Sequence, residues 1–187
     1  MADARSRLEA ALRAAAESTP PHEITASLVA RLGGVHRVTF YRHWPDVESA
    51  LVEVFADEID HVAGIGRLGE GDEIDVAELA AAYDAALRRS LEEIQRRRAI
   101  YRLLFTWPPF MSRVLDAMTA RARVLLENLE RAGVVVEGGR DGSAAAFIAG
   151  AAMASLAWWA SSESEDAQGL ARALIARYPL WWPRVLR

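Results

Sequence analysis

Apolar residues recur every three or four positions along almost the whole chain of 187 residues, which is the spacing of one face of an α-helix. The one run of β-branched residues, Val134-Val135-Val136, lies between glycines and is too short to build a sheet. Proline and glycine mark the breaks, as at Pro20-Pro21 and Gly133. The pattern predicts an all-α fold of about nine helices, near residues 8–15, 24–32, 35–42, 46–62, 75–98, 101–107, 111–132, 143–160 and 170–181.

The helices group into a small three-helix unit at residues 1–46 and a larger helical unit at residues 47–187. The helix near 143–160 carries no charge, but it is short and only weakly apolar for a bilayer span, so we expect it to be buried. Because it is apolar on every side, it needs cover on every side. We expect a homodimer through the last two helices, with small residues such as Gly150 permitting close contact. The alternative is a central helix that its own chain encloses entirely.

Composition excludes several classes of protein. The chain has no cysteine, which rules out disulfides, thiolate metal sites and thiol catalysis. Its net charge of −4 argues against a general nucleic-acid coat protein, and all 22 fixed cations are arginines. The first residues have the pattern of an amphipathic helix and not of a signal peptide. We therefore expect a soluble, cytoplasmic protein that has no membrane partner.

Between Glu23 and Asp46 the chain carries no acidic residue, although acids are frequent on both sides. This window predicts two short helices joined by the turn Gly33-Gly34. The second helix carries hydrogen-bond donors and no carboxylate, as a helix that enters a DNA groove requires. These donors are His36, Arg37, Thr39, Tyr41, Arg42 and His43. The competing interpretation is an ordinary helical hairpin that binds no DNA.

Residues 24–51 resemble the DNA-binding segment of the TetR (tetracycline-repressor-like) transcriptional regulators. The resemblance is carried by a threonine at the start of the first helix of the pair, a Val-Ala pair, a Gly-Val turn and the run Thr-Phe-Tyr-Arg-His. These residues are Thr25, Val29, Ala30, Gly34, Val35, Thr39, Phe40, Tyr41, Arg42 and His43. The resemblance implies a helix-turn-helix domain at 1–46, which binds a palindromic operator in double-stranded DNA, and a ligand-binding and dimerisation domain at 47–187.

The resemblance also assigns contacts. It implies that Thr25 and Tyr41 contact phosphates, and that His36, Arg37, Thr39 and His43 contact bases or phosphates; Val38 and Arg42 belong to the same surface. Three residues depart from the family pattern: His36 replaces a small serine, Val38 replaces a glycine or other small residue, and Val47 replaces a phosphate-binding lysine. Val38 could touch a thymine methyl group or fill the core, and His43 could cap the helix instead of contacting DNA. We expect Leu32, Val35, Phe40 and Trp44 to pack in the core.

The resemblance further implies a small-molecule pocket inside the C-terminal helices. Aromatic and methionine residues gather there, although such residues more often form a core; the candidates are Tyr83, Tyr101, Phe105, Trp107, Phe110, Met111, Met118, Phe147, Met153 and Trp158. We therefore expect a repressor, with no enzymatic activity and no cofactor, that a small, largely apolar or aromatic effector releases from its operator. The alternative is a helical small-molecule-binding or interaction protein with a vestigial helix-turn-helix.

Two further patterns are better explained without a ligand. Residues 64–69 match the dinucleotide fingerprint G-x-G-x-x-G, but a helix precedes them and acids follow, so we interpret them as a linker. Asp57 and His61 lie one helical turn apart and could chelate a metal, but no third ligand is evident.

Overall fold

The computed structural model describes residues 3–64 and 75–182, and these residues form helices and no strand. The all-α prediction is confirmed, and Val134–Val136 lie in an irregular loop. The described helices are α1 (Ala4–Ser18), the 3₁₀ turn η1 (Pro21–Glu23), α2 (Ala26–Leu32), α3 (Arg37–Tyr41), α4 (Val47–Val62), α5 (Val76–Arg96), α6 (Arg98–Leu104), α7 (Pro108–Arg131), α8 (Ser143–Ser161) and α9 (Ala167–Arg177).

Short polar side chains define where most of these helices begin. The carboxylates of Asp3, Asp46, Asp75 and Asp166 each accept a hydrogen bond from a backbone N–H in the first turn of α1, α4, α5 and α9. Such a cap satisfies an N–H group that lacks an intrahelical partner, and its negative charge complements the helix dipole. The helix α7 instead begins with two prolines, which tolerate the first turn because they have no N–H to satisfy.

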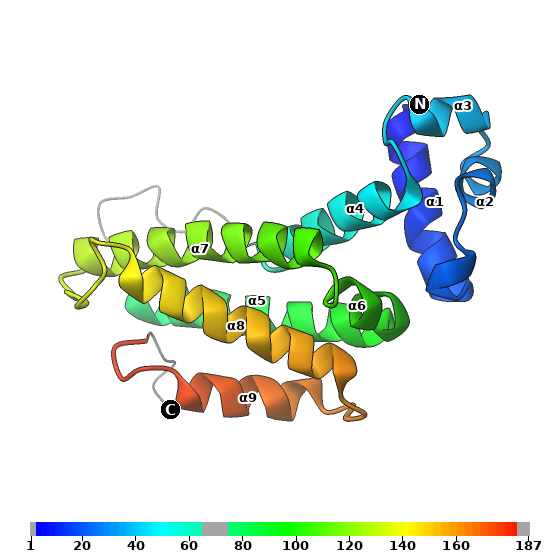
Figure 1. Ribbon diagram of the computed structural model, residues 1–187. Helices are drawn as coiled ribbons and strands as arrows, with labels where there is room; N and C mark the ends of the chain where they lie inside the picture. Colours follow the sequence, from blue (N-terminus) through cyan, green and yellow to red (C-terminus); the bar gives the residue numbers. More distant parts are fainter. Residues whose placement is uncertain (1–2, 65–74, 183–187) are drawn as a thin grey trace.

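The molecule has two parts, which α4 connects (Figure 1). The helices α1, α2 and α3 pack together at one end, and α4 runs from them to the remaining helices. There α5, α7, α8 and α9 lie side by side, with the short α6 at the end nearest α1. One continuous cluster of buried residues joins the two parts, and a second cluster fills the far end of the bundle around Leu125 and Trp182.

The helix α8 is apolar almost all round. It is long and apolar enough, by length and composition, to cross a membrane, but a core helix meets the same criteria. It packs against α5, α6 and α7, and residues such as Ala145, Ile148 and Trp159 are buried. The indole N–H of Trp159 donates to the backbone oxygen of Leu91 at 2.8 Å. One side of α8 is therefore buried in the bundle, whereas Phe147 and Trp158 on the helix are exposed.

Candidate nucleic-acid interface and ligand cavity

The turn between α2 and α3 is held by a residue that the sequence analysis did not single out. Gly34 has a φ of +59°, a left-handed conformation that favours glycine. Nε of Arg7, on α1, donates to the Gly33 oxygen at 2.9 Å, and Nη2 donates to the Gly34 oxygen. The N–H of Val35 donates to the Ala30 oxygen at 2.9 Å. The turn therefore has a fixed shape, which determines the angle at which α3 leaves α2.

Two aromatic residues anchor α3 to the domain. Phe40 and Trp44 are buried, with ring centroids 5.5 Å apart, and the guanidinium of Arg5 lies 5.3 Å from the centre of the Trp44 ring. Val35 is half-buried against the same core. The prediction that Leu32 packs in the core is wrong: Leu32 is exposed, because it is the last residue of α2 and the buried face of that helix is formed by Ala26, Val29 and Ala30.

The opposite side of α3 is open to solvent. His36, Arg37, Val38, Tyr41 and Arg42 are exposed, whereas Thr39 and His43 are half-buried. Val38 has 70% of its surface exposed, so it does not fill the core.

Arg37 and Tyr41 lie one turn apart on this exposed side. Nη2 of Arg37 donates to the Tyr41 hydroxyl at 3.0 Å, and its guanidinium lies 5.3 Å from the centre of the ring. The pair thus holds two hydrogen-bonding groups together on the surface. Thr25 is exposed as well, and its oxygen caps α2 by accepting from the N–H of Leu28 at 3.2 Å, which leaves its O–H able to donate.

The predicted ligand residues lie in three different places. Tyr101, Phe105 and Phe110 pack on one another in the core, with Tyr101 also against Phe55. Trp107, Met111 and Met153 are partly buried beside the same core. Phe147 and Trp158 are exposed on the outer side of α8. The remaining two, Tyr83 and Met118, line a cavity of about 90 Å³.

This cavity lies among α5, α7, α8 and α9 and is lined mainly by small and aliphatic residues. Its polar members are Tyr83, Ser90, Arg121 and Tyr178. The Tyr83 hydroxyl donates to the Arg121 backbone oxygen at 3.2 Å, and burial raises its pKa well above the usual value although the Arg121 charge opposes this. Ser90 and Arg121 were not predicted from the sequence, because a search for aromatic and methionine residues cannot point to the serine, the arginine and the alanines that line this space.

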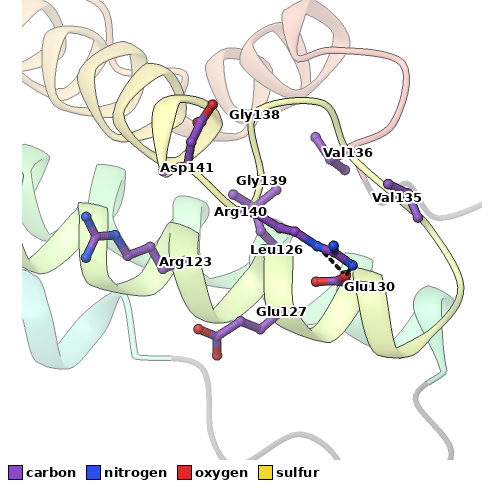
Figure 2. A pocket seen from close by; sticks show the side chains of 11 residues that line it. Arg123, Leu126, Glu127, Glu130, Val135, Val136, Gly138, Gly139, Arg140 and Asp141 are labelled. Atoms are coloured by element: carbon purple, nitrogen blue, oxygen red, sulfur yellow. Dashed lines mark hydrogen bonds and ion pairs between the residues drawn. The ribbon is translucent and has the colours of Figure 1, made fainter.

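A larger hollow lies elsewhere, between α7 and the loop at 133–142 (Figure 2). It measures about 780 Å³ and is lined by charged side chains and glycines. Nε of Arg140 donates to Glu130 at 2.9 Å across it. It contains no residue that the sequence analysis selected.

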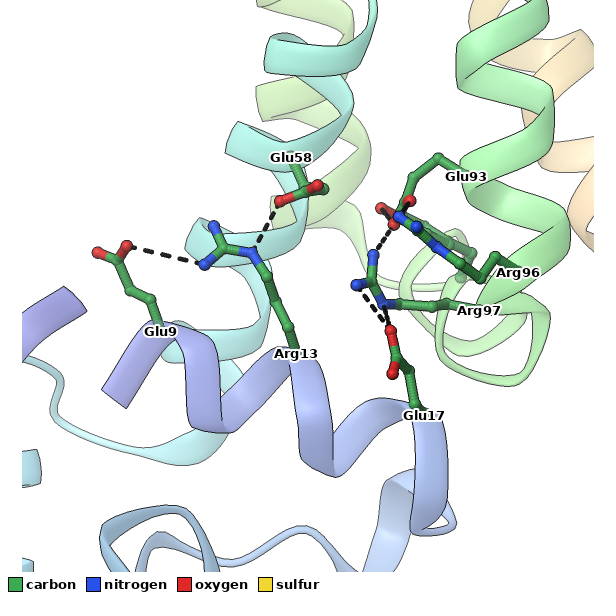
Figure 3. Close-up of polar contacts among 8 residues, drawn as sticks. Glu9, Arg13, Glu17, Glu58, Glu93, Arg96 and Arg97 are labelled. Carbon is green, nitrogen blue, oxygen red and sulfur yellow. Dashed lines mark hydrogen bonds and ion pairs between the residues drawn. The ribbon is translucent and has the colours of Figure 1, made fainter. Parts of the chain in front are cut away.

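Charged residues link the two parts of the molecule (Figure 3). Arg97, just after α5, pairs with Glu93 of the same helix and with Glu17 of α1, where Nη2 lies 2.8 Å from the carboxylate. Arg13 of α1 pairs with Glu58 of α4 at 2.7 Å. The N-terminal helices are therefore tied to the bundle both through α4 and directly.

The structure bears on the possible metal site at Asp57 and His61, but only one residue of the dinucleotide fingerprint is described. Asp57 pairs with Arg113 at 2.7 Å, and the described ranges contain no group of three potential ligands that could hold a metal ion. In the fingerprint at 64–69, residues 65–69 lie outside the described residues.

The all-α fold is similar to that of solved TetR-family regulators. The sequence matches no protein-family model and no curated protein. The chain is similar in structure to the fatty acid degradation regulator FadR from Bacillus halodurans, with 18% identity, a TM-score of 0.65 and 93% of each chain covered.

Two further neighbours agree. A putative TetR-family transcription regulator from Shewanella sp. PV-4 has 17% identity, a TM-score of 0.59 and 97% of each chain covered. The TetR-family repressor AlkX from Dietzia sp. strain DQ12-45-1b, implicated in biodegradation of n-alkanes, has 22% identity and a TM-score of 0.55, with 91% of this chain and 90% of that chain covered. At these identities the likeness concerns the fold.

Proposed function

We propose that the protein is a DNA-binding transcriptional regulator that uses α3 to read an operator. The observation that carries the proposal is the exposed side of α3, where Arg37 and Tyr41 form a hydrogen-bonded pair and no carboxylate is present. Arginine suits phosphates and guanine edges, and a tyrosine hydroxyl suits phosphate oxygens. A helix fixed from behind by Phe40 and Trp44 presents these groups in one orientation.

We also propose that the protein acts as a homodimer. On α8, Phe147, Ala151, Ala154 and Trp158 follow one another at helical spacing, and Phe147 and Trp158 are exposed although large and apolar. A second copy of α8 and α9 would cover this stripe. Each subunit then places α3 in a major groove, with half-sites about 34–36 Å apart. Trp158→Glu is expected to give a monomer in sedimentation experiments, whereas the exposed loop variant Val135→Glu leaves the dimer intact.

We further propose that the protein is a repressor and that a small effector releases it from DNA. The cavity among α5, α7, α8 and α9 supports this, because α4 packs on α5 and α7 and also carries the N-terminal helices. An effector that favours a different position of α4 would shift the dimer away from the conformation that fits the operator. Structural neighbours named as a regulator and as a repressor agree with this proposal.

The competing candidate is a ligand-binding bundle with a vestigial helix-turn-helix. Binding to the DNA upstream of the protein's own gene, measured over a range of salt concentrations, separates the two. Arg37→Ala and Tyr41→Phe should weaken specific binding. Loss of an Arg37–phosphate contact should also reduce the slope of log K against log salt concentration by about one, whereas Tyr41→Phe removes no charge and should leave the slope unchanged. Arg131→Ala, at the far end of α7, serves as the matched control. If the wild-type protein shows no sequence-specific binding at low salt, the regulator proposal is wrong.

A further inference from the structure

The cavity combines apolar walls with one cationic side chain. Leu87, Ile148, Leu156 and Trp182 are among its lining residues, and Arg121 is its one charged member. Tyr83 and Arg121 also line an open groove of about 620 Å³ on the outer surface along α4 and α7. These two residues therefore line both the cavity and the groove.

Arg121 has a partner on α4. Its Nη2 lies 2.7 Å from Oδ1 of Asp60 and also donates to the Asp60 backbone oxygen. Burial lowers the pKa of Arg121, and the Asp60 carboxylate raises it without making up the difference. The Asp60 carboxylate is itself half-exposed, so solvent weakens its attraction to the cation. Both described contacts use Nη2, whereas a bidentate acceptor uses Nη2 together with Nε or Nη1, so such an acceptor has to displace Asp60.

We infer that the cavity binds a small apolar monocarboxylate, whose carboxylate takes the place of Asp60 on Arg121. A planar guanidinium can hold a carboxylate through two parallel N–H···O bonds, which Asp60 does not achieve with one nitrogen. The apolar tail would lie against Leu87, Met118 and Ile148. The cavity of about 90 Å³ has room for roughly three non-hydrogen atoms at the 30 Å³ that a molecule of liquid water occupies, so a tail of three carbons fits.

If the protein is a regulator as proposed above, replacement of Asp60 by the ligand carboxylate also changes how α4 is held. Asp60 lies near the end of α4, and its two contacts with Arg121 tie that end to α7. A carboxylate on Arg121 removes both contacts and leaves Asp57–Arg113 as the remaining described ion pair between these helices. The ligand therefore favours conformations in which α4 has moved away from α7.

Calorimetric titration of the full-length protein with butyrate, and with the neutral isostere butyramide, tests the binding. Butyrate is expected to bind more tightly than butyramide by at least about tenfold, since a charge-assisted bidentate pair replaces a neutral hydrogen bond. Arg121→Gln should abolish this preference. Asp60→Asn should tighten butyrate binding by up to about fivefold, because it removes the competing carboxylate.

Two variants act as controls. Arg123→Gln changes an exposed arginine of α7 outside the cavity and should leave binding unchanged. Ala149→Leu fills the cavity while leaving Arg121 in place, and should abolish binding if the tail enters the bundle. Thermal unfolding of each variant establishes that it is folded. Equal binding of butyrate and butyramide, or equal loss in Arg123→Gln and Arg121→Gln, would overturn the inference.

Operator binding is measured separately, so that the two proposals fail in different ways. Butyrate should weaken operator binding by the wild-type dimer but not by Arg121→Gln. If butyrate binds as described and no operator is bound without it, the regulator proposal fails and the ligand assignment stands. If an operator is bound and butyrate does not bind, the ligand assignment fails alone.

Discussion

Replacing Arg97 by methionine should reveal how strongly the junction between α1 and α5 depends on one buried cation. The Arg97 side chain is 7% exposed and that of Glu93 is 2% exposed, so each is charged in a place from which water is nearly excluded. Burial alone would lower the pKa of Arg97, but the adjacent Glu93 carboxylate and its hydrogen bond raise the pKa overall. The Tyr101 hydroxyl also donates to Glu93, at 3.4 Å.

The expected loss follows from what Arg97→Met leaves behind. Methionine has a similar length, but Glu93 becomes a buried carboxylate without its main partner, and breaking such a pair costs about 3–5 kcal/mol of unfolding free energy. For a chain of this size that loss lowers Tm by roughly 6–20 °C. Chemical denaturation monitored by circular dichroism measures it. The double variant Glu93→Leu with Arg97→Met should recover most of the stability, because no buried charge then remains.

The neighbouring residue provides a matched control. Arg96 pairs with the same Glu93 carboxylate, but its side chain is 58% exposed. Because Arg96 is largely in water and Arg97 stays beside Glu93 in this variant, Arg96→Met should lower stability by at most about 1 kcal/mol. If both substitutions cost the same, burial does not decide the energy of this cluster and the reasoning is refuted.

Three further predictions concern the N-terminal helices. Arg7→Ala should cost about 1.5–3 kcal/mol of unfolding free energy, since it removes charged donors from the carbonyls of the α2–α3 turn, and it should weaken operator binding; unchanged urea denaturation would contradict this. Val38→Ala should change stability by less than about 0.5 kcal/mol, because the side chain is exposed, while altering operator preference in a binding selection. Asp46→Ala should cost about 0.5–2 kcal/mol at neutral pH, whereas Asp46→Asn costs less. The Ser49 N–H lowers the pKa of Asp46, so its contribution is complete above about pH 4 and is lost as the pH falls through the folded pKa; the difference between wild type and Asp46→Ala in denaturation curves should shrink towards pH 3.

The recognition segment could be predicted because its information is local. Thr25 caps α2, the glycines form the turn, and Phe40 and Trp44 anchor α3, all within one stretch of sequence. The helical spacing wrongly predicted that Leu32 is buried, because the last residue of a short helix can face away from the core that the rest of the helix covers.

The cavity could not be predicted in the same way. Its walls combine residues of α5, α7, α8 and α9. The space between these helices depends on how they pack in three dimensions, which the sequence of each helix alone does not indicate. Arg121 and Asp60 are far apart in the sequence, and nothing in the pattern of either helix indicates that they pair. Aromatic residues were a poor guide because Tyr101, Phe105 and Phe110 fill the core with one another.

Four acidic residues of α4 form ion pairs with two of the neighbouring helices. Glu53 and Glu58 pair with Arg5 and Arg13 of α1, so they tie α4 to the N-terminal helices.

Asp57 and Asp60 pair with Arg113 and Arg121 of α7, so they tie the same helix to the bundle. A ligand that takes Arg121 from Asp60 therefore acts on one set of pairs and leaves the other intact. The charge pattern consequently favours movement of α1 and α4 together as one unit. Glu17–Arg97 is an ion pair between this unit and α5, and Nε of Arg89 on α5 also donates to the Val62 oxygen of α4 at 2.8 Å. Both contacts should limit how far the unit can move relative to α5.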